Sequence, residues 1–374
     1  MPTLRRLYQR QNSIKTNHRM LYILNIILSC LYLSVIKERN TFLFLIKVFP
    51  VIFLWVFIVG GQYEIGADYG NYLAFFRYPL DDVRFEPLFT GVSRFVYRLG
   101  IVGQGQFYIF ALINAVVIFI ALHKLGIKHW AIFYFLLITV STFFNNQMNG
   151  IRQCTAVAFV YWGFVELYCS KFKGVALMAV AGGFHFSALA NLCFIFIKRI
   201  TNILTKYPAI LLISLCSISL LPSDEYLNEY LIEMLPEQVK EDTHYESMYA
   251  EDEDTQASTG IVYKLSKLLL LPLYLYSLRL LKNGSLSEKE NLFFRFGVLS
   301  YSLRCALLIN NLIGRFSYYF WIPSILPLYY LCVNMHNRKR YVELAFVLIY
   351  ASAIYFIKVF MGTAEYRSSF IYFQ

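Results

Sequence analysis

The sequence predicts a single integral-membrane domain over residues 1–374, all-α, with about 10–12 transmembrane helices that include one broken, half-helix element. Its composition excludes an ordinary soluble protein, because 58% of the residues are hydrophobic and 15% are charged, against about 25% charged in soluble domains. The apolar residues form long runs, such as Leu21–Ile36, and not the alternation that a membrane β-barrel requires. Helices are therefore the expected spanning element.

Ten apolar stretches are predicted to be spans, since a spanning helix needs about 20 apolar residues. They lie near residues 20–36, 41–60, 105–122, 130–145, 151–169, 207–221, 260–281, 292–313, 316–333 and 342–361. A further stretch, residues 174–197, is also apolar but contains the adjacent pair Gly182 and Gly183.

Short basic connections predict which ends of the spans face the cytoplasm. Four connections hold His123, Lys124, Lys128 and His129; Lys171 and Lys173; Lys282 and Lys289; and His336, Arg338, Lys339 and Arg340. Residues 222–259 contain twelve acidic residues and one lysine, a net charge of −11, and are predicted to be an extracytoplasmic loop. Because the basic residues are spread over short loops, they indicate topology and not a nucleic-acid-binding surface.

Residues 174–197 are predicted to be a broken element and not an ordinary span. The basic residues that flank this stretch, Lys173 and Lys198, should both be cytoplasmic. Two crossings must therefore fit between them, which favours a short helix in, a turn around residues 182–188 and a short helix out. His185 would lie at the tip of this element and face the outer side.

The same orientation places residues 61–104, the short loop 145–151 and the region around Arg315 outside. It also places the basic N-terminal segment, residues 1–19, outside, which the positive-inside rule disfavours. Two explanations stay open: that segment lies in the membrane interface, or the first two predicted spans are miscounted.

Residues 61–104 form the first long outer loop, with acidic, aromatic and arginine residues on a backbone that contains glycines. Within this loop, residues 85–100 carry an apolar stripe, with Arg94 and Arg98 four residues apart. This pattern is typical of an amphipathic helix that lies in the membrane interface.

Short motifs along the chain are similar, in order and spacing, to those of a known membrane family. GADYGNY (residues 66–72) is followed by EPLF (86–89), NGIRQ (149–153) and HFSAL (185–189), and later by Arg315 and Tyr318. Over about residues 21–333 this series resembles the EpsG-type branch of the Wzy-like bacterial exopolysaccharide and O-antigen polymerases. The basic N-terminal extension and the acidic loop depart from that pattern.

The resemblance implies a membrane glycosyltransferase of the bacterial inner (cytoplasmic) membrane, with an architecture similar to GT-C-like polymerases and ligases. Its substrate would be an undecaprenyl-diphosphate-linked oligosaccharide, polymerised at the outer leaflet with the lipid diphosphate as leaving group. The expected partners are this substrate and membrane lipid, and a separate chain-length regulator protein is a further option. No nucleic acid is expected as a partner. No glycine-rich nucleotide loop or DxD-like pair stands out, so no cofactor and no metal is expected.

The chemistry that the resemblance implies needs cations for the diphosphate and a base for the acceptor hydroxyl. The diphosphate-binding candidates on the outer side are Arg77, Arg84, Arg152, Arg304 and Arg315. The catalytic candidates are His185, Asp68 and Glu86. The aromatic candidates for stacking on sugar faces are Tyr69, Tyr72 and Tyr318.

Each membrane-embedded candidate also has a purely structural interpretation. His185 would then be a helix-breaking residue bonded to backbone, and Arg152 or Arg315 would anchor at the interface. Arg304, an arginine near the middle of a predicted span, is a functional-site hypothesis by default, and its structural alternative is an ion pair with Glu166.

For the loop candidates, the alternatives are ion pairs of Arg77 and Arg84 with neighbouring carboxylates, and a local turn-forming role for Asp68 or Glu86. Two other functions also stay open: a transporter that flips the lipid-linked oligosaccharide, and an O-antigen ligase or membrane acyltransferase. A transporter would favour two related halves, and no internal repeat is visible in the sequence.

Overall fold

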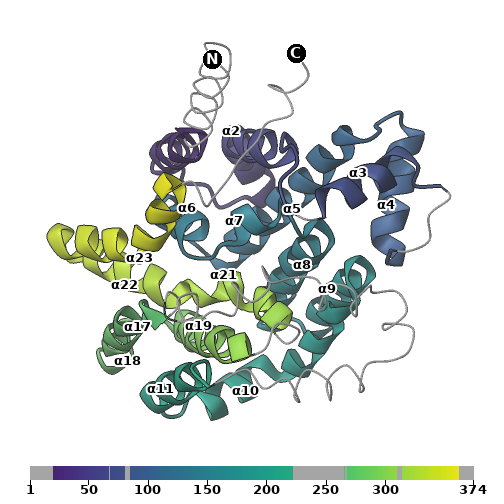
Figure 1. Ribbon diagram of the computed structural model, residues 1–374. Coiled ribbons are helices and arrows are strands. Elements are labelled where there is room, and N and C mark those ends of the chain that lie inside the picture. The colour runs from purple at the N-terminus through teal and green to yellow at the C-terminus, as the bar shows by residue number, and fades with distance from the viewer. Residues whose placement is uncertain are drawn as a thin grey trace, which may run out of the picture. The chain divides into compact units, whose positions relative to one another are not determined.

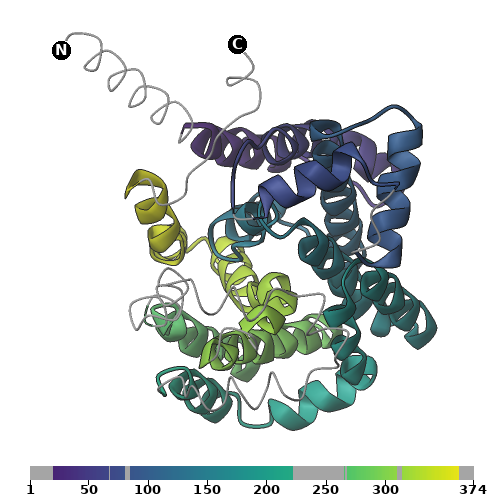
Figure 2. The same cartoon turned by 45° about the vertical axis from the view of Figure 1, so that its right-hand side comes forward.

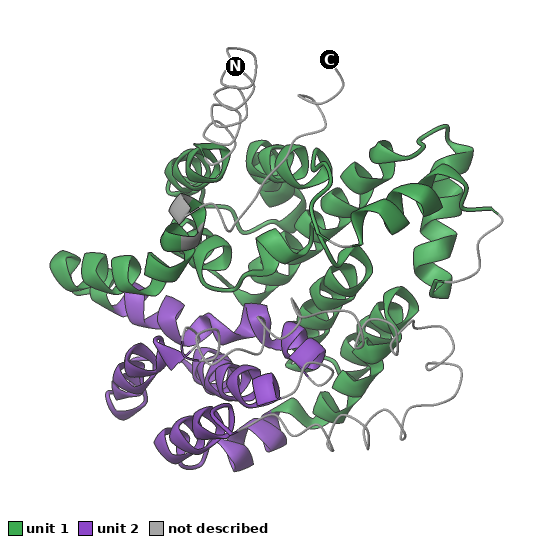
Figure 3. Ribbon diagram, in the orientation of Figure 1, with its two compact units in different colours: residues 1–197, 335–374 green, residues 198–334 purple. Residues whose placement is uncertain are grey.

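The computed structural model describes residues 20–66, 68–80, 85–221, 265, 268–309 and 314–361. These residues form helices and no strand (Figure 1), which confirms the all-helical prediction. The chain divides into two compact units, residues 1–197 with 335–374 and residues 198–334 (Figure 3). The single domain over residues 1–374 stays a prediction, and the acidic loop 222–259 lies outside the described residues.

Apolar helices recur along the described chain, which makes it a multi-pass membrane protein. Five are long and apolar enough to cross a membrane: Thr41–Gly60, Gln104–Leu125, Phe186–Leu204, Glu288–Ile309 and Arg315–Asn337. Four more apolar helices are shorter: Met20–Leu33, Trp130–Thr139, Pro208–Ile218 and Tyr341–Ile357. Each of these begins within a few residues of a predicted span, apart from Phe186–Leu204, which continues the predicted broken element.

The first unit is built around the helix pairs α2–α5, α5–α8 and α8–α9. It contains Met20–Leu33, α2 (Thr41–Gly60), α3 (Tyr69–Arg77), α4 (Pro87–Arg98), α5 (Gln104–Leu125), α6 (Trp130–Thr139), α7 (Phe143–Asn146), α8 (Ile151–Leu167), α9 (Lys171–Phe184), η1 (Phe186–Phe196) and α23 (Tyr341–Met361). Helix α2 packs on α5, α5 on α8, and α8 on α9 (Figure 1 and Figure 2). The α3–α4 segment contacts α5, and α4 also contacts α9.

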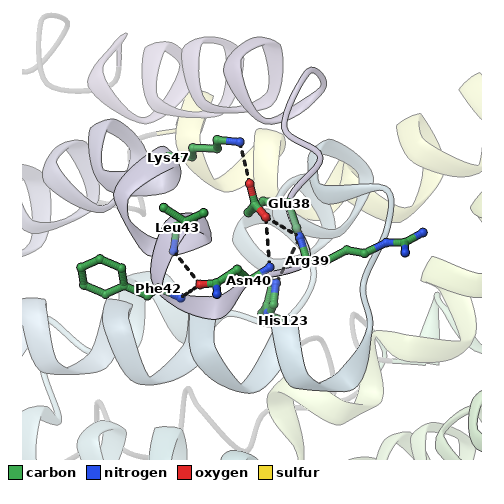
Figure 4. Close-up of polar contacts among 7 residues, drawn as sticks. All are labelled: Glu38, Arg39, Asn40, Phe42, Leu43, Lys47 and His123. Atoms are coloured by element: carbon green, nitrogen blue, oxygen red, sulfur yellow. Dashed lines mark hydrogen bonds and ion pairs between the residues drawn. The ribbon is translucent and has the colours of Figure 1, made fainter.

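The loop before α2 is tied to the far end of α5. Asn40 caps α2, because its Oδ1 accepts hydrogen bonds from the backbone N–H groups of Phe42 at 2.9 Å and Leu43 at 3.1 Å. The Glu38 carboxylate binds Lys47 Nζ at 2.7 Å, and the Glu38 carbonyl oxygen lies 3.1 Å from His123 Nε2 (Figure 4). The loop at residues 37–40 and the basic connection at His123 therefore share one end of the unit, as the predicted orientation requires.

Replacing the cap residue should destabilise this end of the unit. Asn40→Ala removes the side chain that satisfies two backbone donors at the start of α2, and losing such a cap costs about 1 kcal/mol. We expect a lower Tm of the detergent-purified protein, and an unchanged Tm for Asn40→Asp, which keeps a capping oxygen. An unchanged Tm for Asn40→Ala would show that the cap is not needed.

The helix Met20–Leu33 is joined to α6 by polar groups inside the apolar layer. Tyr134 donates its hydroxyl hydrogen to Asn25 Oδ1 at 3.0 Å, and the Ser29 hydroxyl donates to the same oxygen at 3.1 Å. Asn25 and Ser29 are both buried. A hydrogen bond of this kind keeps an amide from facing lipid, where an unsatisfied polar group is costly.

The predicted span 130–145 is wrong as one continuous helix. Helix α6 ends at Thr139, and Thr142 has a left-handed backbone with φ of 65° before α7 begins. The Ser141 hydroxyl donates to the Leu137 carbonyl at 2.6 Å and accepts from the Phe143 N–H at 3.1 Å. A serine that bonds its own backbone in this way competes with the helical pattern, which explains the interruption.

The predicted break in residues 174–197 is confirmed. Helix α9 ends at Phe184, His185 is extended with φ of −161° and ψ of 117°, and the chain resumes as η1. Elements α9 and η1 pack against each other, and Gly182 allows this, since an added Cβ there would lie 2.5 Å from a Leu189 methyl carbon. The outgoing limb is longer than the predicted half-helix, because it continues to Leu204.

Within the segment predicted to be an amphipathic helix, residues 85–100, the structure forms the helix α4 (Pro87–Arg98). Its buried residues include Phe89 and Val96, while Phe95 and Leu99 are exposed. Arg94 fixes the preceding loop, because its Nε donates to the Pro79 carbonyl at 3.0 Å. The placement of this helix in the membrane interface stays a prediction.

The second unit is centred on α19. It contains α11 (Pro208–Ile218), α17 (Leu271–Ser277), α18 (Arg279–Lys282), α19 (Glu288–Ala306), η2 (Leu307–Ile309), η3 (Arg315–Phe320), α21 (Trp321–Ser324), and most of α10 (Ile197–Leu204) and α22 (Leu326–Asn337). Helix α19 begins with a capping box between Ser287 and Glu290 and packs against α11, α21 and η3.

Candidate functional site

The carboxylate of Glu86 joins two other predicted site residues into one cluster in the first unit. Its Oε2 lies 2.7 Å from Arg152 Nη1, and its Oε1 lies 2.7 Å from His185 Nδ1. Glu86 is buried with a side-chain exposure of 6%, while Arg152 and His185 are exposed by 25% and 26%. Arg152 and His185 lie 66 and 99 residues after Glu86 in the sequence. The fold therefore brings the EPLF, NGIRQ and HFSAL motifs together.

Each member of the cluster stands at a helix terminus. Glu86 is the N-cap of α4 but makes no side-chain cap bond, and Pro87 follows it at the first helical position. His185 is the C-cap of α9, where a cation is favoured by the helix dipole. Arg152 is the second residue of α8, where the dipole disfavours a cation, so the Glu86 carboxylate offsets that cost.

Aromatic side chains hold the Arg152 guanidinium in place. Its Nε lies 3.4 Å from the Tyr72 hydroxyl oxygen, and its Cζ lies 4.4 Å from the centroid of the Phe85 ring. Phe85 in turn meets Phe75 edge to face at 4.7 Å, and Phe89 stacks on Phe75 at 5.6 Å. The arginine therefore rests on a packed aromatic layer, which limits its rotamers and stabilises its charge.

The charge state of Glu86 fixes the proton on His185. Burial alone would raise the pKa of Glu86, but the hydrogen bond from His185 and the charge of Arg152 outweigh it and lower the pKa to about 2. An ionised carboxylate only accepts hydrogen bonds, so His185 Nδ1 must carry a hydrogen and donate it. In neutral His185 the lone pair is therefore on Nε2, which is the nitrogen that can accept a proton from a substrate.

The lowered pKa predicts how the stability of the fold depends on pH. The paired carboxylate stabilises the folded state fully above its ordinary pKa of 4.5, and this stabilisation is lost as the pH falls towards 2. Glu86→Gln should lower the Tm by a constant amount between pH 6 and 8, corresponding to at most about 3 kcal/mol. The difference from wild type should shrink below pH 4.5.

The control for this experiment is Glu64→Gln, because Glu64 is an exposed carboxylate in the same loop. Its Tm should follow that of wild type across the same pH range. A Tm difference for Glu86→Gln that grows on acidification would contradict the ionised pair.

The GADYGNY motif is joined to the start of α8. The backbone N–H of Asp68 donates to Asn149 Oδ1 at 3.3 Å. Gly66 has a positive φ of 77°, and an added Cβ there would lie 2.1 Å from the same oxygen, so only glycine fits. Asp68 is the N-cap of α3 without a side-chain cap bond, and Tyr72 lies one turn further along.

The other loop candidates lie at different places. The Tyr69 hydroxyl is buried and donates to Gln104 Oε1 at 2.7 Å, with its ring stacked on Phe107. Arg77 is the exposed last residue of α3. Arg84 lies outside the described residues.

The late arginine candidates belong to the second unit. Arg304 is buried at 5% exposure in α19, and its Nη1 lies 3.4 Å from Ser324 Oγ. Arg315 is exposed at the start of η3, and Tyr318 stacks on Trp321 at 4.1 Å. The suggested partner of Arg304, Glu166, forms an ion pair in the first unit with Lys124 at 2.7 Å.

Two residues of the site were not among the sequence candidates. Phe85 lies under the Arg152 guanidinium, and Asn149 joins two motifs through its side-chain oxygen. Asn149 is part of the NGIRQ motif, which was the signal available for it. Phe85 precedes Glu86 directly, but nothing in the sequence indicates which distant cation its ring will meet.

The comparisons with known proteins agree with the motif series. A family model described as the EpsG family matches residues 42–373, so the match begins later than the resemblance suggested and extends through α23. No curated protein and no solved structure matches the chain. The helix Met20–Leu33 precedes the matched region. The match covers most of the chain, which therefore belongs to the EpsG family, a family linked to exopolysaccharide synthesis.

Proposed function

We propose that this protein polymerises undecaprenyl-diphosphate-linked oligosaccharide repeat units at the outer leaflet of the bacterial inner membrane. The growing glycan leaves one lipid diphosphate and is joined to a sugar hydroxyl of the next lipid-linked unit. The observation that carries the proposal is the cluster of Glu86, Arg152 and His185, which sets a cation for the leaving group beside a base for the acceptor.

Arg152 is the proposed diphosphate ligand. A guanidinium has five N–H donors, more than its contacts with Tyr72 and Glu86 use. A preorganised cation stabilises the negative charge that develops on the leaving diphosphate, which is the largest kind of catalytic contribution in many enzymes. Arg77, Arg84, Arg304 and Arg315 stay candidate diphosphate ligands from the sequence.

His185 is the proposed general base. The acceptor hydroxyl oxygen forms a bond to the anomeric carbon while the bond from that carbon to the diphosphate oxygen breaks, and the hydroxyl proton moves to His185 Nε2. Both Glu86 oxygens are engaged, by Arg152 and by His185, so Glu86 acts as a positioning residue. Asp68 and the rings of Tyr69, Tyr72 and Tyr318 stay candidates for binding the sugars.

The direct test uses the purified protein with synthetic undecaprenyl-diphosphate repeat units and resolves the products on a gel. A ladder of oligomers supports the polymerase, and the ladder should be lost in Glu86→Gln. If no oligomers form while the lipid-linked unit crosses liposomes, the polymerase is wrong and the transporter is favoured. Transfer of a glycan to a different lipid acceptor, without oligomers, would favour a ligase.

A further inference from the structure

We infer that an exposed apolar stripe on α4 binds the polyprenyl chain of the lipid-linked substrate. The inference rests on the proposed function and deepens it, because it assigns a surface to the lipid part of that substrate. The stripe consists of Leu88, Val92, Phe95 and Leu99, which recur at helical spacing and so lie on one side of α4.

Helix α4 turns this stripe outward. Leu88, Phe95 and Leu99 are exposed, and Val92 between them is half-buried. The buried side of the same helix includes a hydroxyl residue, Ser93. A helix that buries a hydroxyl group and exposes its most apolar side is unfavourable in water, so the stripe faces a hydrophobic partner and not solvent.

The stripe begins beside the proposed diphosphate ligand. Leu88 lies two residues after Glu86, whose Oε2 is 2.7 Å from Arg152 Nη1. Leu88 also contacts the last turn of α9, since an added Cβ at Gly183 would lie 2.6 Å from its Cδ1, and α9 ends directly before His185. In a polyprenyl diphosphate, the first isoprene unit is bonded to a phosphate oxygen. A diphosphate bound by Arg152 therefore brings the start of the chain to the start of the stripe.

Attachment to the diphosphate is what selects the polyprenyl chain as the occupant. The acyl chains of bilayer lipids are also apolar, so apolar character alone does not distinguish them from it. A chain whose diphosphate is bound at Arg152 stays near Leu88, and its effective concentration at the stripe is far above that of an untethered polyprenyl chain. The stripe rises about 16 Å from Leu88 to Leu99, which gives it room for the isoprene units nearest the diphosphate. Its occupancy by a polyprenyl chain should therefore depend on Arg152.

The experiment replaces Phe95 with p-benzoylphenylalanine, a photoreactive residue that keeps an aromatic ring at this position. The protein is reconstituted in vesicles of phosphatidylethanolamine and phosphatidylglycerol that contain radiolabelled undecaprenyl diphosphate, and is then irradiated. We expect label on the protein, and at least about fivefold less label after Arg152→Ala. Excess unlabelled undecaprenyl diphosphate should remove the label, whereas undecaprenol, which has the same chain without the diphosphate, should not.

Phe53 offers a matched control in α2, within the same unit. It is exposed by 60% and Phe95 by 62%, so the same photoreactive residue meets surrounding lipid to a similar extent at either position. At position 53 we expect at least about fivefold less label than at position 95, and no change in that label after Arg152→Ala.

Enzyme kinetics provide a second measurement. The double variant Phe95→Ala with Leu99→Ala should raise KM for the lipid-linked unit by about three- to tenfold, because it removes apolar contact with the chain. Its kcat should change by less than about twofold, since the contact is the same in the ground state and the transition state. Phe53→Ala should leave both values as in wild type.

Equal label at positions 95 and 53, or label at position 95 that survives Arg152→Ala, would overturn the inference and make bilayer lipid the occupant of the stripe. Removal of the label by undecaprenol as readily as by undecaprenyl diphosphate, or an unchanged KM in the double variant, would overturn it as well. Failure of the proposed function gives a different result. If the label depends on Arg152 but wild type forms no ladder of oligomers, the stripe still binds the polyprenyl chain and the polymerase is wrong.

Discussion

Arg152→Ala is expected to abolish ladder formation, with a loss of at least 100-fold in initial rate. The guanidinium is joined to the proposed base through the carboxylate of Glu86. Removing one preorganised donor from a developing anion costs about 100- to 1000-fold in related cases. The measurement is the initial rate of oligomer formation from synthetic lipid-linked units, at a protein concentration set by quantitative blotting.

Two further variants separate catalysis from folding. Arg152→Ala leaves the buried Glu86 carboxylate with one partner, so a lower Tm is expected, since breaking a buried ion pair costs about 3–5 kcal/mol. Arg152→Lys keeps the positive charge but loses the planar guanidinium, which can bind an anion through two N–H groups. We expect its Tm to stay close to that of wild type and its initial rate to fall. Arg98→Ala, an exposed arginine at the end of α4, should behave as wild type. A full ladder of oligomers from Arg152→Ala would show that Arg152 is not a residue of the active site.

His185→Asn is expected to fold like wild type and to lose activity by at least about 100-fold. Asparagine can place an amide N–H near the position of Nδ1, so the hydrogen bond to Glu86 Oε1, now 2.7 Å long, can be kept. It has no equivalent of the Nε2 lone pair, so it cannot take the acceptor proton. The comparison is His185→Ala, which loses both the hydrogen bond and the base.

Wild type, His185→Asn and His185→Ala together give a pattern that a purely structural role of His185 would not produce. His185→Asn should keep the Tm and lose kcat, whereas His185→Ala should lose both. If His185→Asn retains the rate of wild type, the hydrogen bond to Glu86 is the part that matters and the general-base role is wrong.

The sequence predicts the break at His185 from the flanking basic residues alone. If these residues lie on the same side of the membrane, an even number of crossings must separate them, and this constraint needs no three-dimensional detail. Basic residues on both sides of a stretch too short for two full helices leave a broken element as the solution. The family-like motifs, and the chemistry that the resemblance implies, named Glu86, Arg152 and His185 separately. These motifs could not join the three residues, because the pairings span 66 and 99 residues and the local sequence does not encode such distances.

Hydropathy does not predict the interruption after α6. Hydropathy averages over a window, and one serine hydroxyl that bonds the backbone on either side, as Ser141 does, hardly changes that average. The length of the second limb of the broken element does not follow from the positive-inside rule, because basic residues need not stand where a helix ends. Helix η1–α10 instead continues past Lys198 and Arg199 to Leu204.

The hydrogen bond between Tyr134 and Asn25 imposes an order on biosynthesis. The helix Met20–Leu33 leaves the ribosome 109 residues before the tyrosine that will donate to the oxygen of its Asn25 amide. During that interval the Ser29 hydroxyl, one turn away on the same helix, can donate to the amide oxygen. The nascent helix must therefore enter the bilayer carrying a polar group and wait there for α6. A chain shortened to begin at α2 would lack Asn25, and with it the acceptor of the buried hydrogen bond from Tyr134.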